Sequence, residues 1–257
     1  MPASDLALIC DAARQAGAIA LGFWQQSPQV WEKPGLGPVT EADLAVNAHL
    51  RAALQAARPD YGWLSEEDPD GPERLGAERV FVLDPIDGTR AFIAGEAHFA
   101  VSLAVVQAGQ PVAAVVYLPA RDRLYCASVN GPALCDGQPI QASAQPSEVG
   151  ARVLTTGPTL APENWPGGVP EVQRSFRASL AYRLCLVAEG RYDAMLTLRP
   201  AWEWDIAAGA LIAARAGAVV TDRYGAALAF NRPHPQADGV VCAAPGVHAG
   251  LIGRLGG

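Results

Sequence analysis

In Val82-Leu83-Asp84-Pro85-Ile86-Asp87-Gly88-Thr89, an apolar run ends in two carboxylates three residues apart. Pro85 restricts the backbone between the carboxylates, and Gly88 permits a tight turn after them. We expect this turn to aim Asp84 and Asp87 at one point. Carboxylates so close repel each other unless a cation or a proton lies between them, and Mg²⁺ suits oxygen ligands of this kind. Taken alone, the spacing is explained more readily by an Asp-rich turn with a helix cap.

A helical turn is expected over residues 90–93, directly after Gly88 and Thr89. Backbone N–H groups at the start of a helix bind phosphate well. The stretch therefore favours an anion beside the carboxylates.

Three further acidic clusters lie elsewhere in the chain. Glu66 belongs to an acidic run just before the apolar strand, and such runs are usually solvated loops. Asp205 begins a strongly apolar helix, where a carboxylate also serves as a cap. Asp43 follows Thr40 with the spacing of a capping box. The clusters read Leu64-Ser65-Glu66-Glu67-Asp68, Trp202-Glu203-Trp204-Asp205-Ile206-Ala207-Ala208-Gly209 and Thr40-Glu41-Ala42-Asp43.

Hydrophobic spacing predicts two helices followed by an antiparallel sheet, an α+β arrangement, in residues 1–145. The helices are expected over 5–24, with Ser4 as cap, and from Thr40 to 57, with a break at 34–38. Strands are expected over 79–83, 99–106, 112–118 and 123–127, the middle two joined as a hairpin by residues 107–110.

Residues 146–257 show a different alternation, typical of an α/β layer. We place the boundary between the two halves near residue 145. Strands are expected over 152–156, 193–198, 218–221 and 238–243, and helices over 179–189 and 205–216.

Composition narrows the function class. The 257 residues are 50% apolar and 18% charged, which predicts a large core and excludes disorder. The net charge of −7 disfavours a nucleic-acid backbone as partner. The five cysteines form no Cys-x-x-Cys pair, and no targeting or membrane-spanning segment is evident. We expect a soluble cytoplasmic protein with a small-molecule substrate.

Together, Glu66-Glu67, Asp84-Pro85-Ile86-Asp87-Gly88-Thr89 and Trp204-Asp205-Ile206-Ala207-Ala208-Gly209 resemble, in this order, the motifs of the inositol monophosphatase family. The resemblance extends from Val39 to Asp222. It implies a layered α/β/α/β/α sandwich of the inositol monophosphatase / fructose-1,6-bisphosphatase type, with the site between its two halves. It also implies phosphatase activity, inhibition by lithium in many members, and a homodimer.

The same resemblance assigns roles to individual residues. It implies two or three Mg²⁺ ions, which would neutralise a phosphate dianion that carboxylates alone repel. The Thr89 hydroxyl, with Asp43 or Glu66, would orient the attacking water for direct in-line transfer without a phosphoenzyme. Gly88 and Thr89 would hold the phosphate, and Asp205 would also contact the substrate. The implied metal ligands are Glu66, Asp84, the carbonyl of Ile86, Asp87 and Asp205.

The substrate is less sharply indicated. Pro200-Ala201-Trp202-Glu203-Trp204-Asp205 resembles the 3′(2′),5′-bisphosphate nucleotidase branch, as does the stretch 179–190. Leu198 lies where animal inositol monophosphatases have a sugar-binding acid. Arg90-Ala91-Phe92 is closer to some histidinol-phosphate phosphatases. We expect a bisphosphate nucleotidase, with an inositol-1-phosphate, histidinol-phosphate or broad sugar phosphatase as the alternative.

Further residues are expected on the substrate side. Arg177, Tyr182 and Arg183 could hold a second phosphate or stack on a base, although an ordinary solvated helix face explains them as well. His98 and His234 lack metal-ligand spacing. A non-catalytic relative that binds a metabolite or a partner is the remote alternative, against which the complete carboxylate set argues.

Overall fold

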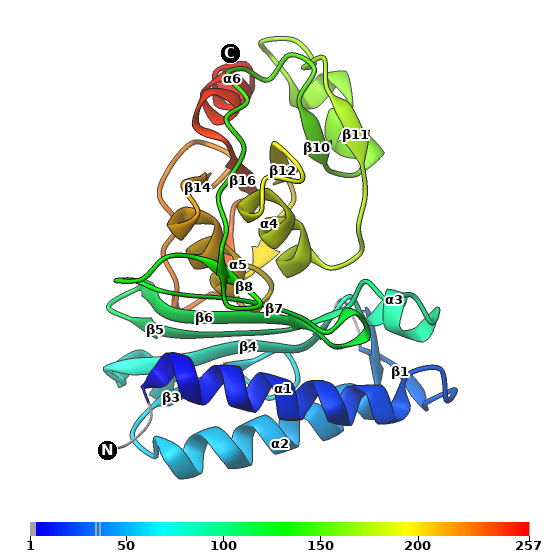
Figure 1. The fold of residues 1–257 in the computed structure, drawn as a ribbon, viewed down its shortest axis with the longest axis vertical. Helices are drawn as coiled ribbons and strands as arrows, with labels where there is room; N and C mark the ends of the chain where they lie inside the picture. The colour runs from blue at the N-terminus through cyan, green and yellow to red at the C-terminus, as the bar shows by residue number, and fades with distance from the viewer. Residues whose placement is uncertain (1–3, 34, 36, 257) are drawn as a thin grey trace.

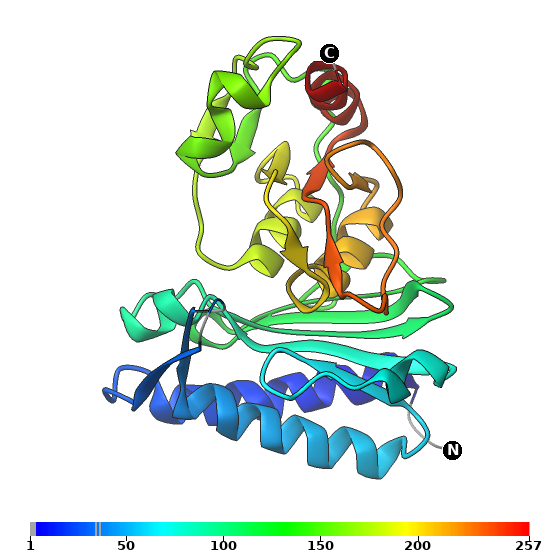
Figure 2. The same ribbon diagram turned by 180° about the vertical axis from the view of Figure 1, so that it is seen from behind.

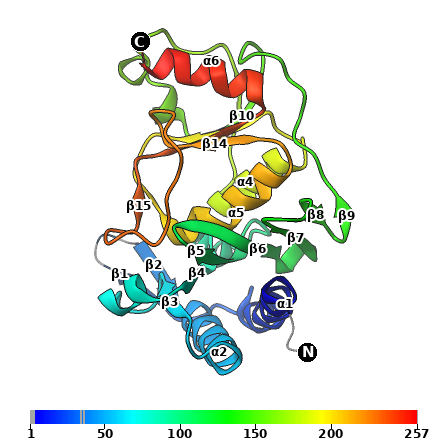
Figure 3. The ribbon, with the colours of Figure 1, turned by 90° about the vertical axis from the view of Figure 1, so that its left-hand side faces the viewer.

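A computed structural model describes residues 4–33, 35 and 37–256, and it arranges them in five layers (Figures 1 and 3). Two helices form the first layer, α1 (Asp5–Phe23) and α2 (Glu41–Ala57). A large sheet, a second helical pair, a smaller sheet and a C-terminal helix follow. The predicted α/β/α/β/α sandwich is confirmed.

The first-layer helices begin where capping residues predict. The Ser4 side chain accepts a hydrogen bond from Ala7 N, and Thr40 and Asp43 form a reciprocal capping box at the start of α2. Apolar residues at helical spacing on both helices are buried against the large sheet. By length and composition α1 could cross a membrane, but this is weak evidence, because core helices of soluble proteins pass the same test.

Within the described residues, the large sheet has seven strands, β3 next to β4 in parallel and the others antiparallel. The predicted hairpin joins β5 and β6 through Ala108 and Gly109, both with positive φ, as a tight turn requires. The order is β3 (Gly62–Ser65), β4 (Arg79–Asp87), β5 (Ala100–Gln107), β6 (Gln110–Leu118), β7 (Arg123–Ser128), β8 (Leu134–Cys135) and β9 (Gln138–Pro139).

Strand β4 is longer than predicted and contains the first motif. Asp84 pairs with Ser102 and Asp87 with Ala100, and the register is irregular between the two aspartates. Pro85 lies within this irregularity and has no N–H for the ladder, so the strand bulges there. The strand thus ends at Asp87, as expected, and the bulge in its last residues aims the two carboxylates.

Helices α4 (Leu180–Ala188) and α5 (Glu203–Arg215) lie between the two sheets and are apolar on nearly all sides. Gly209 of α5 lies directly against Leu184 of α4. A Cβ at position 209 would be 2.6 Å from both Leu184 Cβ and Leu184 Cδ1. This close crossing explains why the third motif ends in glycine.

The smaller sheet has the order β11, β10, β12, β16, β14 in the described part of the chain, and helix α6 (Pro245–Gly256) covers its outer face. The hydrophobic pattern did not predict α6, because glycines interrupt it. The strands are β10 (Arg152–Leu154), β11 (Gln173–Ser175), β12 (Ala194–Thr197), β14 (Val219–Thr221) and β16 (Val240–Ala243).

Short elements complete the fold. The hairpin of β1 (Val30–Lys33) and β2 (Gly37–Thr40) rises from the helical layer beside α3 (Thr89–Ile93), as Figure 2 shows. Sequence analysis placed only a break here, and its Pro34 and Leu36 lie outside the described residues. The other short elements are β13 (Ala201–Trp202), β15 (Gln236–Ala237), η1 (Pro72–Gly76), η2 (Pro119–Arg121), η3 (Gly157–Leu160) and η4 (Pro162–Asn164).

The expected boundary near residue 145 falls between the two sheets, since β9 ends at Pro139 and β10 begins at Arg152. One hydrophobic core nevertheless joins them, because Val116 of the large sheet, Leu184 of α4 and Met195 of the smaller sheet belong to the same buried cluster. The division into residues 1–145 and 146–257 stays a prediction.

The helix crossing leads to a stability prediction. Gly209→Ala should lower the free energy of unfolding by about 1–3 kcal/mol, because the added methyl overpacks against Leu184. Gly253→Ala is the matched control, since a Cβ there meets no atom within 4 Å. Alanine should then stabilise α6 by up to about 1 kcal/mol through helix propensity alone. Denaturant unfolding of both variants measures the difference, and an equal effect at the two positions would contradict the packing argument.

Candidate active site

Three carboxylates from separate elements converge. Oxygen atoms of Glu66, Asp84 and Asp205 all lie within 4.8 Å of one another. Glu66 follows β3, Asp84 lies at the β4 bulge, and Asp205 lies in the first turn of α5. The start of α5 is held against the sheet by Ser102, whose hydroxyl donates to the Trp204 carbonyl at 3.1 Å.

Burial and mutual repulsion oppose ionisation of this cluster. Burial raises the pKa of Asp84 well above its usual value, and Glu66 and Asp87 raise it further. Burial likewise raises the pKa of Asp205, with Asp87 and Glu66 adding to the effect. A set of hard oxygen donors that repel one another fits a hard divalent cation. The residues present therefore fit the metal that the resemblance implies.

Lys33 reaches the cluster from the β1–β2 hairpin. Its Nζ donates to Glu66 Oε1 at 2.9 Å and to both carboxylate oxygens of Glu67, at 2.9 and 3.0 Å. Burial nevertheless raises the pKa of Glu67 to about 7. Sequence analysis missed Lys33, because no motif surrounds it and its hairpin was not expected.

Asp87 is oriented differently from the other three carboxylates. Its Oδ2 accepts from Ser179 Oγ and Ala181 N, each at 2.6 Å, and its Oδ1 accepts from Leu180 N at 3.2 Å. Asp87 thus ties the first motif to the start of α4, and burial raises its pKa to about 6. Its role as a metal ligand stays a prediction.

Glycine is required at position 88 by the backbone conformation and by closely packed neighbours. The φ of Gly88 is +99°, and a Cβ there would lie 3.1 Å from the His98 carbonyl oxygen and 3.4 Å from Ser179 N. The backbone of the motif can therefore come close to α4 and to a ligand in the cleft.

Thr89 and Asp43 face each other. Thr89 Oγ1 lies 3.4 Å from Asp43 Oδ1 and 3.1 Å from the Ile86 carbonyl oxygen. Asp43 Oδ2 accepts from the backbone N and the hydroxyl of Thr40, at 2.8 and 2.6 Å. Asp43 is therefore a capping residue and also a neighbour of Thr89, so the two explanations do not compete. Its burial raises its pKa to about 6.

A cleft of about 1080 Å³ is lined by Glu66, Asp84, Gly88, Thr89 and Asp205. Segments of the C-terminal half line it too, including Arg199 and Trp202. Sequence analysis assigned no site role to Arg199 or Trp202.

The three residues expected on the substrate side separate in the structure. Among the described residues, those that line the cleft include Arg183 but neither Arg177 nor Tyr182. Arg183 is 6% exposed and donates to the carbonyls of Arg177 and Ala178, at 2.5 and 3.2 Å. Its guanidinium also covers the Phe176 ring at 4.6 Å. Arg183 thus shapes the loop before α4 as well as the cleft.

The Tyr182 ring lies among residues that do not line the cleft. Tyr182 is buried, its ring stacks on His98 with centroids 6.1 Å apart, and the Arg121 guanidinium lies 5.9 Å from its centroid. Arg177 donates to the Tyr192 hydroxyl at 3.3 Å. Substrate-contacting roles for Tyr182 and Arg177 stay predictions that the cleft geometry does not support. His234 is exposed and contacts Gln236 Oε1 at 3.0 Å.

Glu203, the acid of the Pro200–Asp205 motif, has structural contacts. It is 1% exposed, and its carboxylate accepts from the backbone N of Asn231 and Arg232, at 2.6 and 3.1 Å. It fixes a loop beside β15 rather than facing the cleft.

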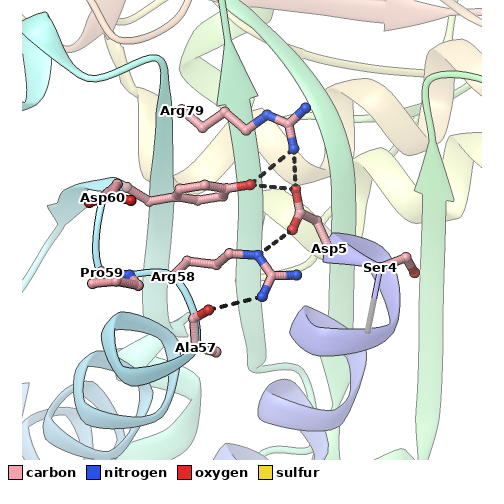
Figure 4. Close-up of a pocket in the computed structure, with 8 residues that line it drawn as sticks. Ser4, Asp5, Ala57, Arg58, Pro59, Asp60 and Arg79 are labelled. Carbon is pink, nitrogen blue, oxygen red and sulfur yellow. Dashed lines mark hydrogen bonds and ion pairs between the residues drawn. The ribbon is translucent and has the colours of Figure 1, made fainter. Parts of the chain in front are cut away.

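A smaller hollow of about 650 Å³ lies at the start of α1, with Asp5 at its centre (Figure 4). Asp5 accepts from Arg58 Nε at 3.0 Å, from the Tyr61 hydroxyl at 2.9 Å and from Arg79 Nη1 at 2.7 Å. Its carboxylate is thus matched by neighbouring cations, whereas in the larger cleft Glu66 is paired with Lys33 but Asp84 and Asp205 form no ion pair among the described residues. The larger cleft is therefore the candidate active site.

Residues 2–255 match the Inositol monophosphatase family. The chain belongs to this family. It is therefore a metal-dependent phosphoric monoester hydrolase, as the motifs predict.

Individual relatives of this phosphatase carry different names. The 3′(2′),5′-bisphosphate nucleotidase CysQ of Escherichia coli (strain K12) is 31% identical over 228 residues, which cover 87% of this chain and 92% of the relative. The inositol-1-monophosphatase of Rhizobium meliloti (strain 1021) is 35% identical over 215 residues, covering 78% and 77%. The crystal structure of extragenic suppressor protein suhB from Bartonella henselae has a TM-score of 0.81 at 27% identity, covering 97% of each chain.

The buried acids lead to a prediction on stability and pH. A carboxyl whose pKa is raised by folding keeps its proton to a higher pH in the folded protein than in the unfolded chain. The metal-free fold therefore loses stability as the pH rises through that interval. In chelator at pH 8, Asp84→Asn should raise Tm, at about 2–4 °C for each kcal/mol gained, and the gain should shrink toward pH 4.

Thermal unfolding across this pH range measures the effect, with Glu163→Gln as the control because Glu163 is exposed and outside the cleft. Saturating Mg²⁺ should stabilise the unmodified protein more than the Asp84 variant. A lower Tm for Asp84→Asn at pH 8 in chelator would contradict the repulsion argument.

Proposed function

We propose that this phosphatase uses two or three Mg²⁺ ions held by the side chains of Glu66, Asp84, Asp87 and Asp205 and the Ile86 carbonyl. The observation that carries the proposal is the convergence of Glu66, Asp84 and Asp205 within 4.8 Å. Asp87 would have to share its oxygens between a cation and the start of α4.

When bound, the cations supply Lewis-acid chemistry, offset the charge of the ester and lower the pKa of water. The residues of the chain provide orientation. The Thr89 hydroxyl, 3.4 Å from Asp43 Oδ1, orients the attacking water together with Asp43 or Glu66. The backbone N–H groups of Gly88 and Thr89 hold the phosphate, and Asp205 contacts the substrate.

We propose that the substrate is a 3′(2′),5′-bisphosphate nucleotide. The likeness to CysQ supports this, as does Leu198 in place of a sugar-binding acid. The alternative is inositol 1-phosphate, which the R. meliloti relative favours by its name; a histidinol-phosphate or broad sugar phosphatase is a further possibility. A non-catalytic binding role is disfavoured because Thr89 and the complete carboxylate set are present.

The setting is also part of the proposal. The cysteines at positions 10, 126, 135, 185 and 242 are all free thiols, which supports a reducing cytoplasm. The family resemblance supports a homodimer and a small phosphate ester as the ligand.

Thr89 provides a test of the water-orienting role. Thr89→Ala should lower kcat by about 10²-fold or more with little change in KM, because the hydroxyl is lost while the backbone N–H remains. Thr89→Ser is the matched control and should retain most of kcat. Steady-state kinetics separates the two constants, and an alanine variant that changes only KM would rule the role out.

A substrate panel tests the function itself. Phosphate release should be measured from adenosine 3′,5′-bisphosphate, inositol 1-phosphate, histidinol phosphate and fructose 1,6-bisphosphate, with Mg²⁺ and with excess chelator. The highest kcat/KM is expected for adenosine 3′,5′-bisphosphate, and chelator should abolish release reversibly. Better use of inositol 1-phosphate would favour the alternative, and full activity in chelator would exclude the metal.

A further inference from the structure

Arg199 lies in the short turn between β12 and β13, at the edge of the active-site cleft. The next residue is Pro200, which restricts position 199 to extended backbone conformations. The Arg199 side chain therefore leaves the wall of the cleft from a backbone with few alternatives.

Neighbouring segments support this turn. Arg223 Nη1 donates to the Leu198 carbonyl at 3.0 Å. Gly239, with φ +76°, approaches so closely that a Cβ there would lie 2.6 Å from the Thr197 carbonyl oxygen. Only glycine fits this contact, so the β15–β16 connection presses directly on the segment that carries Arg199.

The guanidinium of Arg199 has no internal counter-charge. Across the described positions, it has no hydrogen-bond or ion-pair partner. Arg199 is exposed and lines the cleft, so its donors are available to a ligand. Arg183, which also lines the cleft, is close enough to be affected by this charge: burial lowers the pKa of Arg183, Asp87 opposes that shift, and Arg199 adds to it. Lys33, by contrast, is matched by Glu66 and Glu67.

Two arginines that line the same cleft attract an anion from solution. A guanidinium with free donors matches the oxygens of phosphate in geometry as well as charge. The reacting phosphate belongs at the converging acids Glu66, Asp84 and Asp205, where the cations would lie. The two arginines are not part of that cluster, and they are thus suited to a different anionic group.

We propose that Arg199, beside Arg183, forms a subsite for a second phosphate of the substrate, separate from the phosphate that is hydrolysed. The inference rests on the proposed phosphatase site and deepens it by naming what recognises a bisphosphate. Arg199 is a specificity residue here and does not touch the reacting phosphorus.

Trp202 narrows the class of substrate. Trp202 lines the cleft three residues after Arg199. Its ring stacks on Trp204, with centroids 4.6 Å apart and planes 8° from parallel, and the His234 ring lies tilted at 5.7 Å. An aromatic surface beside a phosphate subsite suits a nucleoside better than a polyol, because every base has a face that stacks. The combination favours a nucleoside bisphosphate.

Matched substrates with and without the second phosphate test the subsite. For adenosine 3′,5′-bisphosphate, Arg199→Gln should lower kcat/KM by about ten- to a hundredfold, mainly through KM, because the lost contact is equal in the ground and transition states. For adenosine 3′-monophosphate, the same variant should behave as the unmodified enzyme. Arg199→Lys should recover part of the loss, because it restores the charge.

Arg174→Ala is the control, since Arg174 is exposed and lies outside the residues that line the cleft. The same comparison is made with fructose 1,6-bisphosphate and fructose 1-phosphate. If the enzyme ignores nucleotides but Arg199→Gln acts selectively on fructose 1,6-bisphosphate, the subsite stands and the nucleotidase proposal fails.

If adenosine 3′,5′-bisphosphate is the best substrate and Arg199→Gln affects both adenosine nucleotides equally, the subsite is overturned while the nucleotidase proposal stands. The subsite is also overturned if the unmodified enzyme has the same kcat/KM with and without the second phosphate, for both the adenosine and the fructose substrates.

Discussion

The repulsion among Glu66, Asp84 and Asp205 is the constraint around which the other layers are arranged. No local segment would hold such groups together, because each is drawn away from the others and toward water. The three are held by rigid elements instead: the end of β3, the bulge of β4 and the first turn of α5. Tight packing behind them, such as Gly209 against Leu184, leaves α5 no room to shift and relieve the repulsion.

Asp87 and Ser179 connect the two halves of the molecule at the same place. A carboxylate that accepts three donors at a helix start is favoured by the hydrogen bonds and by the helix dipole. This contact joins residues far apart in sequence. The geometry of the cleft therefore depends on how the large sheet and the inner helices pack together, rather than on either motif by itself.

Local sequence patterns predict much of this structure. The caps at Ser4 and Thr40, the β5–β6 hairpin and the layered fold all follow from spacing, turn chemistry and motif resemblance. The β1–β2 hairpin did not, and with it Lys33 was missed, because a short exposed hairpin has little hydrophobic pattern. The burial of Tyr182 beside His98 also lay beyond reach, since a nine-residue helix between two sheets buries almost every face. Arg199 belongs to no recognisable motif. Only the structure of the cleft shows that its guanidinium has no hydrogen-bond or ion-pair partner among the described residues.

The separation of the three acids along the chain has a consequence for how the protein is assembled. Residues 66, 84 and 205 meet only after the last inner helix has docked, so an incompletely folded chain offers no site of comparable affinity. A ligand of that cluster then binds the native state alone and shifts the folding equilibrium toward it by mass action. Partly folded chains, which expose apolar surface to aggregation and proteolysis, gain no such protection. Binding of a ligand to the cluster would therefore stabilise only completely folded molecules and would lower the population of partly folded intermediates.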